Sequence, residues 1–192
     1  MRTRILDEAV RIIAVQGERS LRLRDLARGI GISEPTLYHY FENRDSLVVA
    51  ALAHRYRIEL SETIDPFVPA VRKCTTQAEF MSVFHKVYRD SIAPGRMAVR
   101  MTRAEVVASA FTRESLRVEI KEIMMESLGP SIEALQIAKD RGWLRPDIDI
   151  HAFAFLNLSL ISSRIFPEIQ GDPDLLAKWD DLAFSAVKSL IT

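Results

Sequence analysis

The sequence predicts an all-α protein of about nine helices, with a small N-terminal three-helix domain and a larger C-terminal helical domain. Apolar residues recur at helical spacing along nearly all of the 192 residues. No segment shows the apolar–polar alternation of a half-buried strand. The 7 glycines and 8 prolines are also too few for a protein built on many tight β-turns.

Four helices are expected in the N-terminal part, over residues 5–16, 23–30, 33–41 and 44–63. Gly17 suits the position just after the first helix, and the second ends near Gly29 or Gly31. Ser33 can cap the third helix through its hydroxyl group. The boundary between the two domains is placed at residue 48, which gives domains of 1–48 and 49–192.

Five more helices are expected in the C-terminal part, over residues 78–92, 97–111, 116–142, 149–165 and 172–190. The dipeptide Gly129-Pro130 interrupts the third of these, which is therefore either one kinked helix or two helices end to end. Asp149 and Asp172 can cap the last two helices.

Net charge, cysteine content and the length of apolar runs limit the class of protein to which this chain can belong. The 26 basic and 26 acidic residues cancel, so bulk charge does not draw this chain to nucleic acid. A single cysteine, Cys74, cannot form an internal disulfide, and the first twenty residues contain no apolar run typical of a signal peptide, so a cytoplasmic protein is expected. The longest apolar run, residues 152–166, includes Arg164 and is too short to cross a bilayer.

The segment from Leu21 to Phe41, LRLRDLARGIGISEPTLYHYF, has the pattern of a helix-turn-helix. Its apolar residues, such as Leu26, Ala27 and Leu37, are spaced to share one small core. This leaves the other face of the helix over residues 33–41 free for DNA. Hydroxyl, imidazole and guanidinium groups suit phosphates and base edges. The candidate DNA-binding residues from this pattern are Arg22, Arg24, Glu34, Thr36, Tyr38, His39, Tyr40 and Arg44. For Tyr40 a place in the core is the alternative.

From Ile5 to about Leu52 the chain resembles the TetR family of transcriptional regulators, through ILDEAVRIIAVQG, LRDLARGIGIS and PTLYHYFENRDSL. The resemblance implies that Thr36, Tyr38 and Arg44 contact the DNA backbone, while Ser33, Glu34, Pro35 and His39 help to read bases. It also implies an all-α C-terminal domain that binds an inducer and pairs two chains.

Two positions depart from the family pattern. Glu18 stands where the family usually has an apolar residue, and Arg22 stands where it usually has a Ser or Thr helix cap. A missing cap costs about 1 kcal/mol. Residues 1–48 hold eight arginines and seven acidic residues, a net charge of only +1.

The resemblance places several segments of the second half around the inducer pocket, and polarisable and aromatic residues on these segments favour an apolar or amphipathic small molecule. Polar side chains among these residues would orient the ligand, and an Arg103 side chain that points into the pocket would favour an acidic ligand. The candidate ligand-binding residues are Met81, Phe84, His85, Tyr88, Met97, Met101, Arg103, Met124, Phe153 and Asn157.

The last two predicted helices are expected to form a four-helix interface with a second copy of the chain. The first of them is apolar nearly all round, so it must be buried on more than one side. The candidate interface residues are Phe155, Leu158, Ile161, Ile165, Trp179, Leu182, Ala186 and Leu190. The alternative is that both helices pack only within their own chain.

We therefore expect a homodimeric, ligand-responsive DNA-binding regulator that binds a pseudo-palindromic operator, most often as a repressor. A helical carrier protein with a weakened DNA-binding motif is the alternative. No catalytic motif or cofactor fingerprint is present, so an enzyme is not expected. Asp147, Asp149 and His151 have ligand-like spacing, but a loop and a helix cap explain them, and no metal is expected.

Overall fold

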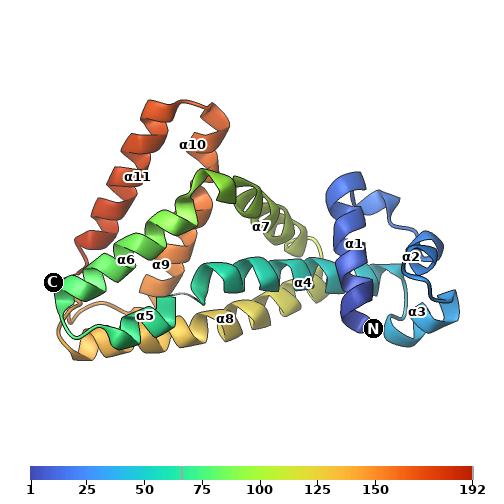
Figure 1. Cartoon of the computed structure of the whole chain (residues 1–192), viewed down its shortest axis with the longest axis horizontal. Coiled ribbons are helices and arrows are strands. Elements are labelled where there is room, and N and C mark those ends of the chain that lie inside the picture. Colours follow the sequence, from blue (N-terminus) through green and yellow to red (C-terminus); the bar gives the residue numbers. More distant parts are fainter. Residues whose placement is uncertain (66, 192) are drawn as a thin grey trace. The chain divides into compact units, whose positions relative to one another are not determined.

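The computed structural model describes residues 1–65 and 67–191, and this part of the chain is helical almost throughout (Figure 1). The α-helices are α1 (Arg2–Gln16), α2 (Leu23–Ile30), α3 (Glu34–Tyr40), α4 (Arg44–Ile64), α5 (Phe67–Lys73), α6 (Gln77–Ile92), α7 (Met97–Ala110), α8 (Glu114–Asp140), α9 (Ile150–Ser163), α10 (Ile165–Gln170) and α11 (Pro173–Lys188). Two single 3-10 turns are η1 (Glu18–Ser20) and η2 (Pro94–Arg96).

The all-α prediction is confirmed. All nine expected helices are present, and the short helices α5 and α10 are added to them. The segment around Pro130 is one continuous helix, α8, which settles the alternative that the sequence left open. Among the described residues, strand pairing is limited to one isolated bridge between Leu144 and Ile191.

The chain divides into two compact units. The first holds residues 1–58 with residues 106–123, and the second holds residues 59–105 with the segment from Met124 to the C-terminal end. Helices α4, α7 and α8 therefore each contribute to both units, and the first division falls inside α4 at residue 58.

The first unit is built on apolar side chains that the helical period places on one side of each short helix. Ile5 and Ala9 of α1, Leu26 of α2, Leu37 of α3 and Leu47 of α4 are all fully buried. This is the core expected for the motif, and it leaves the opposite face of α3 in solvent.

The second unit has an aromatic core, in which the rings of Trp143, Phe80, Phe84 and Phe153 contact one another in that order. Helix α6 begins with a capping box, in which Thr76 and Glu79 exchange side-chain and backbone hydrogen bonds. Asp149 caps α9 and Asp172 caps α11, as the sequence predicts.

A buried cluster of charged side chains also lies in the second unit. Glu168 of α10 accepts hydrogen bonds from Arg100 of α7 and from Arg164, which lies between α9 and α10. Arg164 also forms a two-point ion pair with Asp180 of α11, with N–O distances of 2.7 and 2.8 Å. These ion pairs tie α7, α10 and α11 together.

The segment Ile150–Gln170 is long and apolar enough to cross a bilayer by length and composition alone, since α9 and α10 extend the apolar run expected from the sequence. Its packing gives another reason for this composition. Phe153, Leu158 and Ile161 face the core of the second unit, and Arg164 and Glu168 belong to the buried charged cluster. One side of the segment therefore packs against the rest of the second unit, while its other side, with Phe166 and Ile169, is exposed.

Candidate functional site

The turn between α2 and α3 is fixed by backbone geometry. Gly31 ends α2 in the left-handed conformation, with φ at 71°, which favours glycine because any side chain would be strained there. The next amide, of Ile32, donates to the carbonyl of Ala27 at 3.0 Å and closes the helix end. Ser33 then caps α3 by accepting from the Thr36 amide at 3.3 Å.

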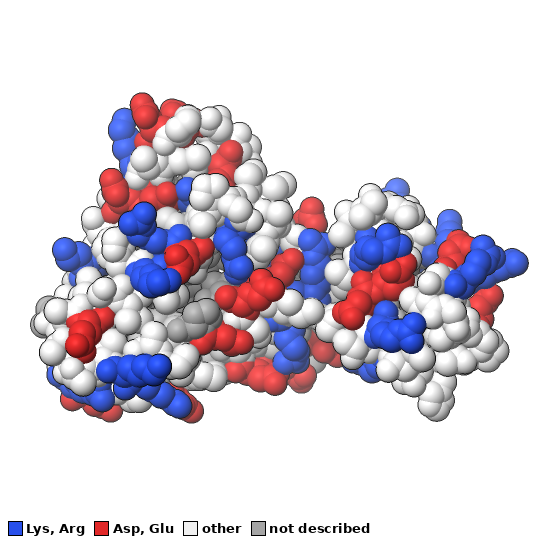
Figure 2. All heavy atoms as spheres, viewed as in Figure 1, with Lys and Arg blue, Asp and Glu red and all other residues white. Residues whose placement is uncertain are grey.

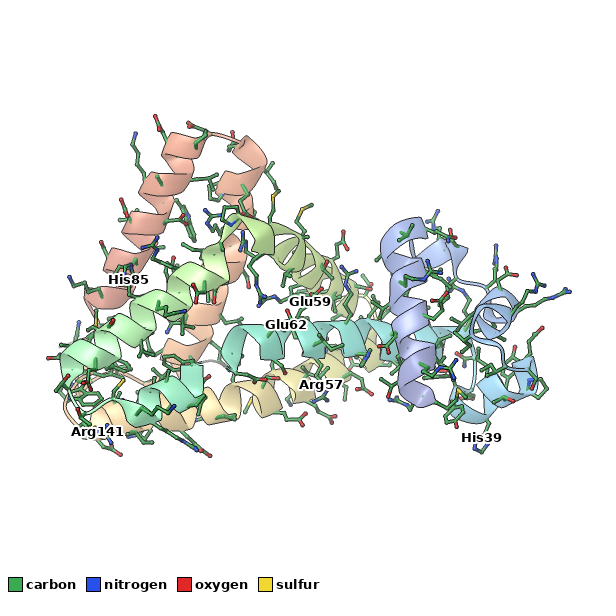
Figure 3. All side chains as sticks on the ribbon, in the orientation of Figure 1. His39, Arg57, Glu59, Glu62, His85 and Arg141 are labelled. Carbon is green, nitrogen blue, oxygen red and sulfur yellow. The ribbon has the colours of Figure 1, made fainter. Side chains whose placement is uncertain are left out.

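The outer face of α3 is aromatic and polar. The side chains of Tyr38 and Tyr40 are 50% and 38% exposed, so neither lies in the core. Figure 3 shows His39 projecting away from the helix, and its ring meets the ring of Tyr40 edge to face at 5.3 Å. Phe41, by contrast, is buried. The helix thus offers two hydroxyl groups and an imidazole to a partner.

The remaining polar candidates lie around the same face. Arg22, Arg24, Glu34 and Pro35 are exposed, at the starts of α2 and α3. Arg22 occupies the N-cap position of α2 without a side-chain cap, so the missing cap expected from the sequence is real. Its guanidinium group is consequently available to a phosphate.

Arg44 has a structural role that the sequence did not reveal. Its guanidinium group is half-buried, and it donates to the carbonyl of Leu21 at 2.9 Å and to the carbonyl of Glu18. These bonds fasten the first turn of α4 to the segment that precedes α2. A contact between Arg44 and the DNA backbone, which the resemblance implies, would have to use the guanidinium N–H groups that these two bonds leave free.

Glu18 is explained by a partner far away in the sequence. Arg113, next to the start of α8 and in the same compact unit, forms a two-point ion pair with it at 2.8 and 2.5 Å. The hydrogen bonds from Arg113 hold the pKa of the Glu18 carboxyl below its usual range, against the opposing effect of burial. The departure of Glu18 from the family pattern was the one signal that could have indicated such a partner.

Charge on the surface is mixed. Figure 2 shows basic and acidic side chains interspersed on the visible face of each unit, in agreement with the zero net charge. Attraction to DNA must therefore come from the local arrangement around α2 and α3, not from a general positive field.

A cavity lies in the second unit, between the end of α4, α5, α6, α8 and α9. It encloses about 80 Å³ at its centre, within about 590 Å³ of empty space that includes its opening to solvent. The lining side chains are Ile64, Phe67, Phe84, Val87, Tyr88, Ser91, Leu128, Ser131, Leu135, Ala154, Asn157, Leu158 and Ile161.

Three of the ten candidate ligand-binding residues, Phe84, Tyr88 and Asn157, line this cavity. The other seven, which are not among its lining residues, are Met81, His85, Met97, Met101, Arg103, Met124 and Phe153. Met97 and Met101 are exposed on α7. His85, labelled in Figure 3, borders a separate surface hollow, where its ring lies 4.4 Å from that of Phe184.

Comparison with known proteins bears on the identity of the chain. Residues 5–51 match the model of the bacterial regulatory proteins of the tetR family. The HTH-type transcriptional repressor KstR2 of Rhodococcus jostii (strain RHA1) is 29% identical over 167 residues, which cover 81% of this chain and 74% of that protein. The HTH-type transcriptional regulator BetI of Rhizobium meliloti (strain 1021) is 30% identical over 99 residues, which cover 50% of this chain and 47% of BetI.

The N-terminal region of the chain, residues 5–51, is that of the tetR family. The chain is a DNA-binding transcriptional regulator, and the comparisons do not favour the helical carrier alternative. A solved structure of the ketosteroid transcriptional regulator KstR2 of Mycobacterium tuberculosis has the same fold, with a TM-score of 0.55 and 18% identity over all of this chain and 94% of that one. GusR of Salmonella enterica has a TM-score of 0.68 and 18% identity, covering 97% and 95% of the two chains.

The candidate dimer residues differ in exposure. Phe155, Leu182 and Ala186 are exposed, and Ile165, Trp179 and Leu190 are half-buried. Leu158 and Ile161 are covered by their own chain and line the cavity. Large apolar side chains that the sequence analysis did not include are exposed on the same elements, namely Leu156, Phe166, Ile169 and Leu175.

The remaining polar candidates have ordinary structural roles. Asp147 is held by a two-point ion pair with Arg145, and Asp149 caps α9. No group of residues able to hold a metal is found within 1–65 and 67–191. Burial raises the pKa of the Cys74 thiol, which slows its oxidation because the thiolate is the reactive form.

Proposed function

We propose that this protein is a homodimeric TetR-family repressor, which leaves a pseudo-palindromic operator when a small molecule enters the cavity of the second unit. The observation that carries the proposal is the outer face of α3, where Tyr38, His39 and Tyr40 project from a helix held by a fixed turn. In a dimer, two such helices would enter successive major grooves about 34–36 Å apart. A cytoplasmic, non-enzymatic protein fits this function.

Helix α4 is the natural connection between the two sites. It begins at Arg44, which is bonded to the segment before α2, and its last residue, Ile64, lines the cavity. A ligand releases DNA only if it binds the DNA-free conformation more tightly. The regulator from Saccharomonospora viridis, whose structure contains choline, is a protein of this fold with a bound small molecule.

Selection of random and genomic DNA fragments on the purified protein, at two salt concentrations, tests the proposal. We expect enrichment of an inverted repeat whose binding weakens steeply with salt, because arginine–phosphate contacts release counterions. If no repeat is enriched, even after the protein has been unfolded, washed free of ligand and refolded, the proposal is wrong.

Replacing Tyr38 with phenylalanine should weaken operator binding roughly tenfold or more. The change removes one exposed hydroxyl group, and a hydrogen bond to a charged phosphate contributes about 1.5–3 kcal/mol. The slope of affinity against salt should stay unchanged, because no charge is lost. Fluorescence anisotropy with the selected operator measures both quantities. Ser189→Ala, which removes an exposed hydroxyl from the end of α11, is the control and should bind as the wild type does.

Replacing Leu182 with glutamate should shift the protein from dimer to monomer. Leu182 is 71% exposed on α11, and a carboxylate placed in the middle of an apolar interface loses its hydration without gaining a partner. Analytical ultracentrifugation measures the change. The control is Phe111→Glu, at a position 82% exposed just after α7, and it should remain dimeric. A dimeric Leu182→Glu variant would mean that the interface lies elsewhere.

A further inference from the structure

Two side chains that line the cavity of the second unit carry buried, unsatisfied polar atoms. The hydroxyl oxygen of Tyr88 and the Oδ1 atom of Asn157 are both buried and have no hydrogen-bond partner among the described residues. Both side chains line the cavity, and Tyr88 is only 4% exposed. Because buried polar groups are normally paired, two such atoms in one cavity indicate a missing partner.

Neighbouring contacts decide which hydrogen-bonding role each atom offers. The Nδ2 group of Asn157 donates to the carbonyl of Phe153 at 2.9 Å, which leaves Oδ1 as an acceptor directed elsewhere. Burial, and secondarily the negative charge of Asp180, raise the pKa of Tyr88 to about 12, although Arg164 opposes the shift. Tyr88 therefore keeps its proton at neutral pH and can donate it.

The residues that line the cavity carry no charge. None of its lining residues is ionisable at neutral pH, since the polar ones are Tyr88, Asn157, Ser91 and Ser131. Ser91 donates its own proton to the carbonyl of Val87 at 2.8 Å. A charged ligand would lose its hydration in this cavity without gaining a counter-ion, so the walls discriminate against it. Arg103, which the sequence analysis considered as an anchor for an acidic ligand, does not line the cavity.

We infer that the cavity binds an uncharged, largely apolar molecule with a hydroxyl group, which accepts from the Tyr88 hydroxyl and donates to Asn157 Oδ1. This inference rests on the proposed function, because it names the class of the effector. The remaining surface of such a molecule would contact Phe67, Phe84 and the aliphatic side chains of α8 and α9. Buried water is the competing occupant, and it would satisfy the same two atoms.

The test is calorimetric titration of the full-length protein with hexanol, compared with hexanoate and hexylammonium ions of the same length. We expect hexanol to bind at least tenfold more tightly than either ion. Tyr88→Phe and Asn157→Leu should each weaken hexanol binding roughly tenfold, because each removes one hydrogen bond to the ligand. Gln136→Leu, which removes an exposed amide group from α8 outside the cavity, is the matched control and should not change the affinity.

A second readout separates a ligand site from a water site. Without ligand, Tyr88→Phe should raise the melting temperature, because it removes an unsatisfied buried polar atom. A lower melting temperature together with unchanged hexanol binding would mean that water satisfies these atoms, and the inference would be wrong. Equal binding of the charged analogues would also overturn it.

Operator affinity, measured on the same samples without ligand, distinguishes this failure from failure of the proposed function. Operator binding without hexanol selectivity would reject only the ligand class. Selective hexanol binding without any operator binding would reject the proposed function and leave the ligand class standing.

Discussion

Replacing Glu168 with glutamine is expected to lower the free energy of unfolding by about 3–5 kcal/mol, the usual cost of removing one partner from a buried ion pair. The Glu168 carboxylate is almost fully buried and accepts from both Arg100 and Arg164. Arg100 is fully buried, and its other hydrogen bond goes to the neutral carbonyl of Ser91 at 2.9 Å. Glutamine would leave this guanidinium group without a counter-ion. Urea denaturation followed by circular dichroism measures the loss.

Two control variants test whether the expected loss of stability arises from the burial of the ion pair. Glu133→Gln breaks an exposed ion pair with Arg72 and should cost no more than about 1 kcal/mol. The double variant Arg100→Met with Glu168→Gln should be more stable than Glu168→Gln alone, because it removes the uncompensated charge along with its partner. If Glu168→Gln cost no more than Glu133→Gln, the buried cluster would not stabilise the fold.

The local features of the fold could be predicted because they depend on residues close together in the sequence. Ser33, Asp149 and Asp172 cap the helices that were expected to follow them, since a cap is decided within three residues. The start of α6 was placed late because its capping box, Thr76 with Glu79, was not recognised. That motif is also local, so the sequence contained the information.

Long-range partners could not be predicted in the same way. Glu18 and Arg113 are 95 positions apart, and Arg100 and Glu168 are 68 apart, and no periodicity relates such pairs. The cavity shows the same limit. Helical spacing indicates that α6 and α9 each bury a face, but only the packing shows that Tyr88 and Asn157 border one cavity while His85 does not.

A variant of Arg44 can distinguish a structural role from a DNA contact. Replacing Arg44 with lysine should weaken operator binding at least tenfold. Lysine keeps the positive charge but lacks the planar fork that reaches the carbonyls of both Leu21 and Glu18. Both carbonyls would lose a charge-assisted hydrogen bond, at a cost of about 1–3 kcal/mol in stability. Because the charge remains, the dependence of affinity on salt should match that of the wild type.

Arg24 is expected to act only as a phosphate contact, because it is exposed on α2 and does not bond to backbone carbonyls as Arg44 does. Arg24→Lys should bind nearly as the wild type does, whereas Arg24→Gln should reduce the salt slope by about 0.9, the value for one lost phosphate contact. If Arg44 were instead mainly a phosphate contact, Arg44→Lys would bind nearly as the wild type does, like Arg24→Lys, and would leave stability unchanged. Anisotropy titrations at several salt concentrations, with a denaturation curve for each variant, decide between the two roles. The structure favours the first, because two of the guanidinium nitrogens of Arg44 already donate to the protein's own backbone.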